Sequence, residues 1–147
     1  MLTDLMGAIK DYSISIELTS EKIPGTIDNY SKAKTFLAYD ERAQAKYNLE
    51  DYVGALSDFT KLIEFDPKYI NAYLFRGHSK GNLGDYRGAI NDYTQIIEID
   101  TKNSTAYFVR GMCKIKHNMK DSGCLDLSKA GELGDPVAYY YIKKNCQ

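Results

Sequence analysis

Two series of charged residues recur along the chain and are the clearest candidates for chemistry. One series is of arginines and the other of aspartates: Arg42, Arg76 and Arg110, and Asp11, Asp58, Asp92 and Asp126. Opposite charges that recur together predict a ladder of partly buried ion pairs between neighbouring elements, in which the loss of one partner costs stability. The alternative interpretation is a row of free guanidinium groups that binds an acidic partner.

The histidines and cysteines give a weaker indication. Cys113 and His117 lie four residues apart, and Cys124 follows seven residues later, a spacing that a zinc site could use. A structural role is favoured, because Cys124 lies on the same apolar helix face as Leu127. No phosphate-binding loop or metalloprotease pattern occurs, and nothing positions a catalytic triad. We therefore expect no bound metal, no cofactor and no enzymatic activity.

Composition excludes several classes of partner. The chain has 44% hydrophobic and 27% charged residues and a formal net charge of −1, which indicates a globular protein. Without a basic surplus, we expect neither nucleic acid nor a membrane as a partner. Three cysteines without a CxxC pair argue against a disulfide framework and favour a reducing, cytoplasmic location. A signal peptide that has been removed is the alternative.

One nine-residue pattern occurs four times, as Asp4–Tyr12, Asp51–Phe59, Asp85–Tyr93 and, in a more divergent form, Met119–Leu127. The aspartates near the ends of the last three copies are 34 residues apart, and a period of this length is typical of repeat proteins. An apolar stretch at helical spacing that carries the arginine precedes each of these three copies. Each unit therefore predicts a first helix, a short turn and a second helix that contains the nine-residue pattern.

The turn and the helix crossing each have a sequence signature. Gly84 can adopt a positive φ at little cost, and Asp51 and Asp85 can cap the second helices. Small residues on the first helices predict a close approach to small residues on the second helices. The two sets are Gly77 and Gly111 on the one side, and Ala55, Ala89 and Gly123 on the other.

These features resemble the tetratricopeptide repeat family. The resemblance rests on the 34-residue helix–turn–helix unit, the aromatics Tyr39, Tyr73 and Tyr107 in the first helices, and Pro67 at the end of one unit. It implies three repeats at residues 36–69, 70–103 and 104–137. The arginines, where the family usually has leucine, and Thr101, where it usually has proline, depart from the pattern. The C-terminal segment also resembles a group of bacterial members.

The ends of the chain extend this arrangement. Residues 1–20 form a half-repeat, a second helix whose apolar face something must cover. Residues 21–35 are an insertion, and we expect a long helix to start within it near Ile27, with Thr26 as its N-cap. Residues 136–147 form a C-terminal capping helix in which Val137, Tyr140 and Tyr141 cover the last repeat. The prediction is a single all-α domain over residues 1–147, a right-handed α-solenoid.

By the resemblance, the first helices line a concave groove that binds a peptide or helix of an unidentified partner protein. The side chains expected there are Asp40, Gln44, Tyr47, Asn48, Asn71, Leu74, His78, Asn82, Phe108, Met112 and Ile115, with Leu37 beside them. An apolar strip of this kind often marks a binding surface. In the competing interpretation, the terminal helix folds back over Phe108 and Ile115.

Chaperone-binding members of the family grip a C-terminal carboxylate with lysine, arginine and asparagine. The corresponding residues here are Asp40, Gln44, Phe75, Thr105 and Val109, so we expect no such clamp. The expected function is a non-catalytic protein-interaction module. The alternative is self-assembly through the N-terminal half-repeat, with a homodimer as one form and an upstream array as another.

Overall fold

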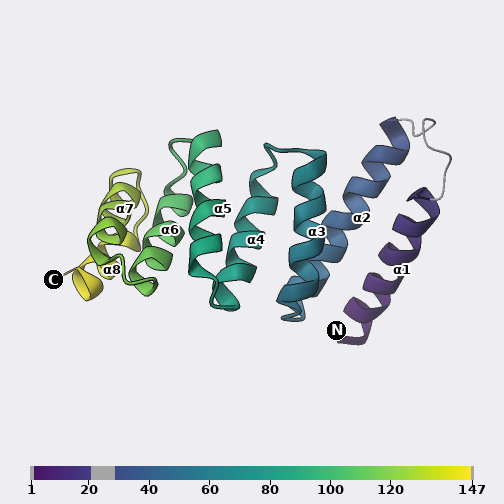
Figure 1. Ribbon diagram of the computed structural model, residues 1–147, viewed down its shortest axis with the longest axis horizontal. Helices are drawn as coiled ribbons and strands as arrows, with labels where there is room; N and C mark the ends of the chain where they lie inside the picture. The colour runs from purple at the N-terminus through teal and green to yellow at the C-terminus, as the bar shows by residue number, and fades with distance from the viewer. Residues whose placement is uncertain (1, 21–28, 147) are drawn as a thin grey trace. The chain divides into compact units, whose positions relative to one another are not determined.

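The computed structural model describes residues 2–20 and 29–146 of the 147-residue chain. These residues form eight α-helices and no strand, so the predicted all-α class is confirmed (Figure 1). The helices fall into two compact units, residues 1–72 and 73–147. None of the described helices is long and apolar enough to cross a membrane.

The first unit contains α1 (Leu2–Ser20), α2 (Asn29–Asn48), α3 (Tyr52–Phe65) and the start of α4 (Ile70–Asn82). α2 is a single helix that includes residues before the predicted start of the first repeat at Phe36. The predicted N-cap Thr26 and start near Ile27 lie outside the described residues. The buried side chains of α3 include Phe59 and Leu62, which are almost fully inaccessible to solvent.

The second unit contains the rest of α4, then α5 (Tyr86–Ile99), α6 (Ser104–Lys116), α7 (Lys120–Glu132) and α8 (Ala138–Asn145). Tyr93 and Ile96 of α5 take the same places in the sequence pattern as Phe59 and Leu62, and they are equally buried. Leu127 of α7 is also fully buried, although it stands where the other copies have an aromatic residue.

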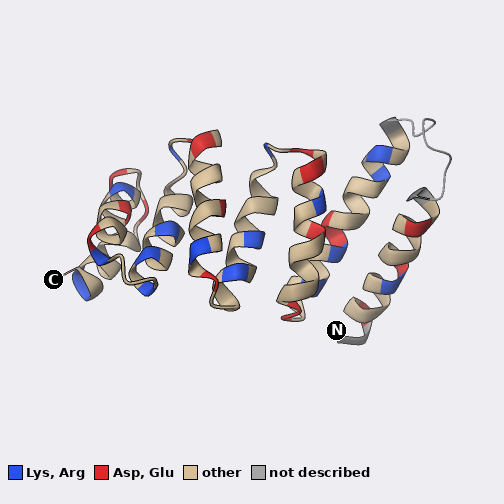
Figure 2. Cartoon of the chain, viewed as in Figure 1, with Lys and Arg blue, Asp and Glu red and all other residues tan. Residues whose placement is uncertain are grey.

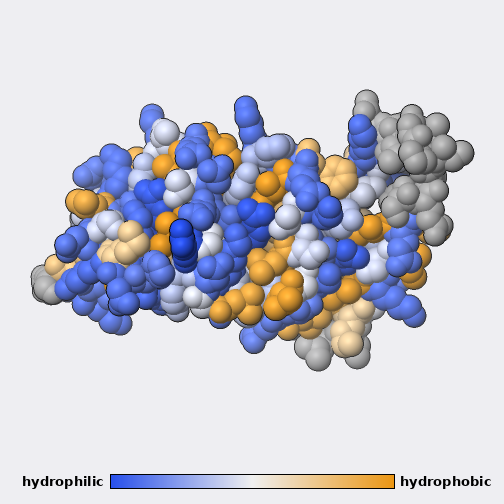
Figure 3. Space-filling view, viewed as in Figure 1, coloured by the Kyte–Doolittle hydropathy of each residue, from blue (hydrophilic) through white to orange (hydrophobic). Residues whose placement is uncertain are grey.

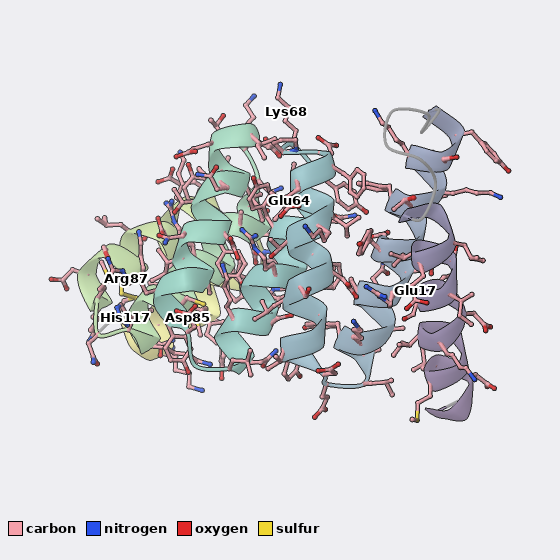
Figure 4. All side chains as sticks on the ribbon, turned by 45° about the vertical axis from the view of Figure 1, so that its right-hand side comes forward. Glu17, Glu64, Lys68, Asp85, Arg87 and His117 are labelled. Atoms are coloured by element: carbon pink, nitrogen blue, oxygen red, sulfur yellow. A yellow bond between two sulfur atoms is a disulfide. The ribbon has the colours of Figure 1, made fainter. Side chains whose placement is uncertain are left out.

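The predicted turn chemistry is confirmed. The carboxylates of Asp51 and Asp85 accept hydrogen bonds from the backbone N–H groups of Gly54 and Gly88, which caps α3 and α5. Asp85 is labelled at the start of α5 in Figure 4. Gly84 has a φ of 83°, a conformation that glycine adopts without the steric cost of a Cβ atom.

Small residues on the first helices allow close helix contacts. A Cβ atom on Gly111 would lie 2.8 Å from the backbone oxygen of Gly123, so α6 and α7 meet as predicted. A Cβ atom on Gly77 would lie 2.6 Å from the ring of Tyr93, so α4 approaches α5 closely at this glycine.

The prediction that the cysteines form no disulfide is wrong. Cys124 of α7 is bonded to Cys146, directly after α8, and Cys113 stays a buried free thiol. An odd number of cysteines does not exclude a disulfide, because here Cys113 is buried as a thiol while Cys124 and Cys146 meet. The disulfide removes the argument for a reducing compartment.

The capping helix differs from its prediction in which side chains it uses. Val137 and Tyr140 are exposed, whereas Ala138 is fully buried and the ring of Tyr141 contacts Phe108 of α6. The reason is the register of α8, which begins at Ala138 after a turn closed by the Asp135 carboxylate.

Candidate functional site

Each aspartate of the last three copies binds an arginine of the first helix before it. In the first unit, Nε and Nη2 of Arg42 donate to the two carboxylate oxygens of Asp58 at 2.9 and 2.6 Å. Arg76 binds Asp92, and Arg110 binds Asp126, with the same two-point geometry in the second unit. Such bidentate pairs are stronger and more specific in geometry than single hydrogen bonds between neutral groups. Figure 2 shows basic residues on the first helices α2, α4 and α6.

A lysine completes each pair, and the sequence analysis missed it. Lys46, Lys80 and Lys114 lie four residues after the arginines, and each Nζ lies 2.8 Å from the aspartate that the arginine binds. Their own 34-residue spacing was the signal that could have found them. We call each set of arginine, lysine and aspartate an Arg–Lys–Asp cluster.

The arginines of these clusters are covered from another side by aromatic rings. The guanidinium carbon of Arg42 lies 5.4 Å from the ring centre of Tyr39, and Arg76 and Arg110 stand over Tyr73 and Tyr107 at similar distances. Cation–π contacts of this kind add to the attraction of the aspartates. The guanidinium groups therefore bind within the chain, and they do not form a free row for an acidic partner.

Asp11 differs from the other aspartates of its series. It is exposed on α1 and forms an ion pair with none of the residues in the described ranges. Arg42 of α2 contacts α1 at another residue, since its Nη1 donates to the hydroxyl of Ser13 at 3.0 Å.

In the first unit, the predicted groove residues of α2 form a hydrogen-bonded cluster. The Asp40 carboxylate accepts from the Tyr69 hydroxyl at 3.2 Å and from the Gln44 side chain at 2.9 Å. Burial raises the pKa of Asp40, and these two hydrogen bonds oppose that shift. Asn71 is hydrogen-bonded to the same Tyr69 hydroxyl. Polar groups are therefore held in place on this side of α2.

The remaining groove candidates of the first unit are less constrained. Leu37, one turn before Asp40, is 58% exposed. The ring of Tyr47 packs edge-on against Tyr52 at 5.6 Å, and Asn48 is exposed. This side of α2 thus combines an exposed apolar side chain with fixed hydrogen-bonding groups.

In the second unit, Leu74 is partly exposed and Asn82 is exposed on α4. His78 lies between the rings of Phe75 and Tyr93, with centroids 6.1 and 5.9 Å away. Burial lowers the pKa of His78, so the neutral imidazole is favoured here. It acts as an aromatic packing residue.

The groove candidates of α6 are partly used within the chain. Phe108 contacts the ring of Tyr141 at 5.3 Å, so α8 covers part of it, as the competing sequence interpretation expected. Ile115 packs on Gly123 of α7, where an added Cβ atom would lie 2.7 Å from it. Met112 is partly exposed. The described residues contain no group of three or more acidic, histidine or cysteine side chains able to hold a metal ion.

A family model described as Tetratricopeptide repeat matches residues 70–103, the range of α4 and α5. Among solved structures, the second such domain of the human RPAP3 protein, in complex with an HSP70 peptide, has a TM-score of 0.73 at 19% identity and covers 79% of this chain and 98% of that one. The fold is that of tetratricopeptide repeat domains.

Two further structures have the tetratricopeptide fold. The domain of Arabidopsis OM64 has a TM-score of 0.72 at 21% identity, over 78% of this chain and 97% of that one. The type III secretion translocator chaperone SycD of Yersinia enterocolitica has a TM-score of 0.66 at 21% identity, over 76% and 86%. No curated protein matches the chain in sequence.

Proposed function

We propose that this tetratricopeptide fold is a non-catalytic interaction module that binds a peptide or helix of a partner protein on its first helices. The observation that carries the proposal is the side of α2 where exposed Leu37 stands beside the Asp40–Gln44–Tyr69 cluster. An exposed apolar side chain beside oriented polar groups offers a peptide both an apolar anchor contact and hydrogen-bonding partners. Similar structures support this, since two of them are domains of RPAP3 bound to an HSP90 peptide and an HSP70 peptide.

The ligand that we propose differs from those peptides. Two of the residues in the family's clamp positions are Asp40 and Gln44, and Asp40 repels a terminal carboxylate. An internal segment that donates hydrogen bonds to Asp40 and places an apolar side chain on Leu37 fits this surface. Leu74 and Met112 are partly exposed on first helices of the second unit and offer apolar contacts of the same kind there.

The experiment is selection of peptides from a displayed random library on the full chain, followed by affinity measurement. We expect Leu37→Glu to weaken binding of the selected peptides by about tenfold or more, the effect of losing about 1.4 kcal/mol. The matched control is Val53→Glu, because Val53 is 67% exposed on the second helix α3. Equal binding to both variants and to the unchanged protein would remove α2 from the site.

A second candidate function is assembly through α1, because Met6 and Ile14 are exposed on that helix. In this case the chain would form a homodimer whose mass in sedimentation falls to that of a monomer in Ile14→Glu. Leu37→Glu would leave the mass unchanged, which separates the two candidates.

A further inference from the structure

The helix α1 packs through only one of the two faces that its sequence pattern provides. By the nine-residue pattern, α1 corresponds to α3 and α5, the second helices of repeats. Arg110 of α6 donates to Thr94 of α5, and Arg42 of α2 donates in the same way to Ser13 of α1, the residue equivalent to Thr94. α1 therefore contacts α2 as the second helix of a repeat contacts the helix after it, and Ile16 is buried there.

The other face is the one that a second helix turns toward its own first helix. On α3, Ala55 and Asp58 are buried there, and Phe65 packs on Phe36 and Tyr39. We call the equivalent surface of α1, formed by Ala8, Asp11 and Leu18, the outer face.

The outer face is open in the described parts of the chain. Ala8 is only partly buried, Asp11 is exposed, and Leu18 is 62% exposed. Figure 3 shows hydrophobic side chains at the surface over α1. The three equivalent positions on α3 pack the same kinds of groups against α2, so the pattern of a packed face is present on α1 without the packing.

The chemistry of this face specifies its occupant. Asp58, Asp92 and Asp126 each bind an arginine and a lysine four residues later, and a small residue directly follows the arginine. We propose that the outer face of α1 binds a helix of another protein that carries an aromatic residue, then arginine and a small residue, then lysine. The arginine and lysine pair with Asp11, the small residue lies on Ala8, and the aromatic residue covers Leu18.

A second copy of this chain does not meet that requirement with its described residues. Each arginine–lysine pair at repeat spacing, on α2, α4 and α6, is already bound to a buried aspartate. To release one pair would leave that carboxylate buried without a counter-charge, which is strongly unfavourable. The occupant is therefore a helix whose basic pair is not already engaged.

The direct test measures fluorescence anisotropy of a labelled peptide with the sequence of residues 36–48, which contains Tyr39, Arg42, Ala43 and Lys46. We expect saturable binding to the full chain, weakened about tenfold by Asp11→Asn. Asp121→Asn, at an exposed aspartate in the first turn of α7, is the matched control and should bind like the unchanged protein. A peptide with glutamate in place of its arginine and lysine should not bind. Equal affinity of the Asp11→Asn and Asp121→Asn variants for the unaltered peptide would overturn the proposal.

A fusion keeps the proposal testable if the free peptide is too short to form a helix. Residues 36–50 are joined directly before Asp4, which places the added helix and its turn as in the first repeat. We expect this fusion to melt at a temperature several degrees higher than the same fusion in which glutamate replaces the added copies of Arg42 and Lys46. Equal melting temperatures would contradict the proposal.

Self-association through the outer face would also contradict it. A dimer in the unfused chain that Asp11→Asn dissociates would place a second copy on the outer face. Leu37→Glu should leave peptide binding to α1 unchanged, because Leu37 belongs to the proposed site on α2. A result against the outer face would therefore be distinguishable from a result against the proposed function.

Discussion

Asp92 is the residue on which several contacts of the second unit converge. Its carboxylate binds Arg76 and Lys80, and its side chain is only 3% exposed. Burial makes the carboxylate costly to desolvate, and the two cations together compensate that cost. Because water cannot replace them, both cations are needed for the aspartate to be stable in this position.

We predict that Asp92→Asn lowers the free energy of unfolding by about 3 kcal/mol, because it leaves two cations without their counter-charge. Urea denaturation followed by circular dichroism measures this. The control is Glu64→Gln, which breaks the exposed pair with Lys61 and should change stability little. A loss for Asp92→Asn no larger than that of the control would mean that the cluster is not a stabilising unit.

At the scale of the helices, two glycines lie in different surroundings. A Cβ atom on Gly111 of α6 would collide with the backbone of α7, whereas one on Gly7 of α1 would have no neighbour within 4 Å. Helix propensity favours alanine equally at both positions, by about 1 kcal/mol. The two sites therefore separate packing from propensity.

We predict that Gly111→Ala destabilises the protein by about 1–2 kcal/mol, because overpacking outweighs the gain in propensity. Gly7→Ala should stabilise α1 by about 0.5–1 kcal/mol. Denaturation midpoints of the two variants, compared with the unchanged chain, decide this. The packing argument fails if both substitutions shift the midpoint in the same direction.

At the scale of the whole chain, consecutive helices make the contacts, as in other repeat proteins. The contacting pairs within the units include α1 with α2, α2 with α3, α4 with α5, α5 with α6, α6 with α7, and α7 with α8. Stability in such a chain is close to a sum of terms from neighbours, so a helix with one packed face is the weakest element. In the described part of α1, only Ile16 is buried, whereas α3 buries Ala55, Asp58, Phe59 and Leu62.

We predict that the backbone amides of α1 exchange with deuterium faster than those of α3, because opening α1 exposes less apolar surface. Native-state exchange followed by mass spectrometry measures the difference. Reduction of the Cys124–Cys146 bond should speed exchange in α8 and leave α1 unchanged, since the disulfide ties α8 to α7. Equal protection of α1 and α3 would show that something covers the outer face in solution.

Much of the fold could be predicted from the sequence, because the signals are local and repeated. The 34-residue period, the caps at Asp51 and Asp85 and the positive φ at Gly84 each depend on residues a few positions apart or on their regular recurrence. Local periodicity also predicted a basic residue opposite each aspartate. It did not show that lysine shares the carboxylate, because spacing along one helix does not determine how many basic side chains reach a carboxylate on the next helix.

Tertiary structure alone decided which side chains meet across long distances. Cys124 and Cys146 form a disulfide because α8 turns back beside α7, which depends on the register of a short helix rather than on cysteine count. The cover of Phe108 by Tyr141 has the same origin. The open outer face of α1 is also a tertiary result. Its sequence specifies a packed helix, and only the arrangement of neighbours determines whether Asp11 and Leu18 find partners.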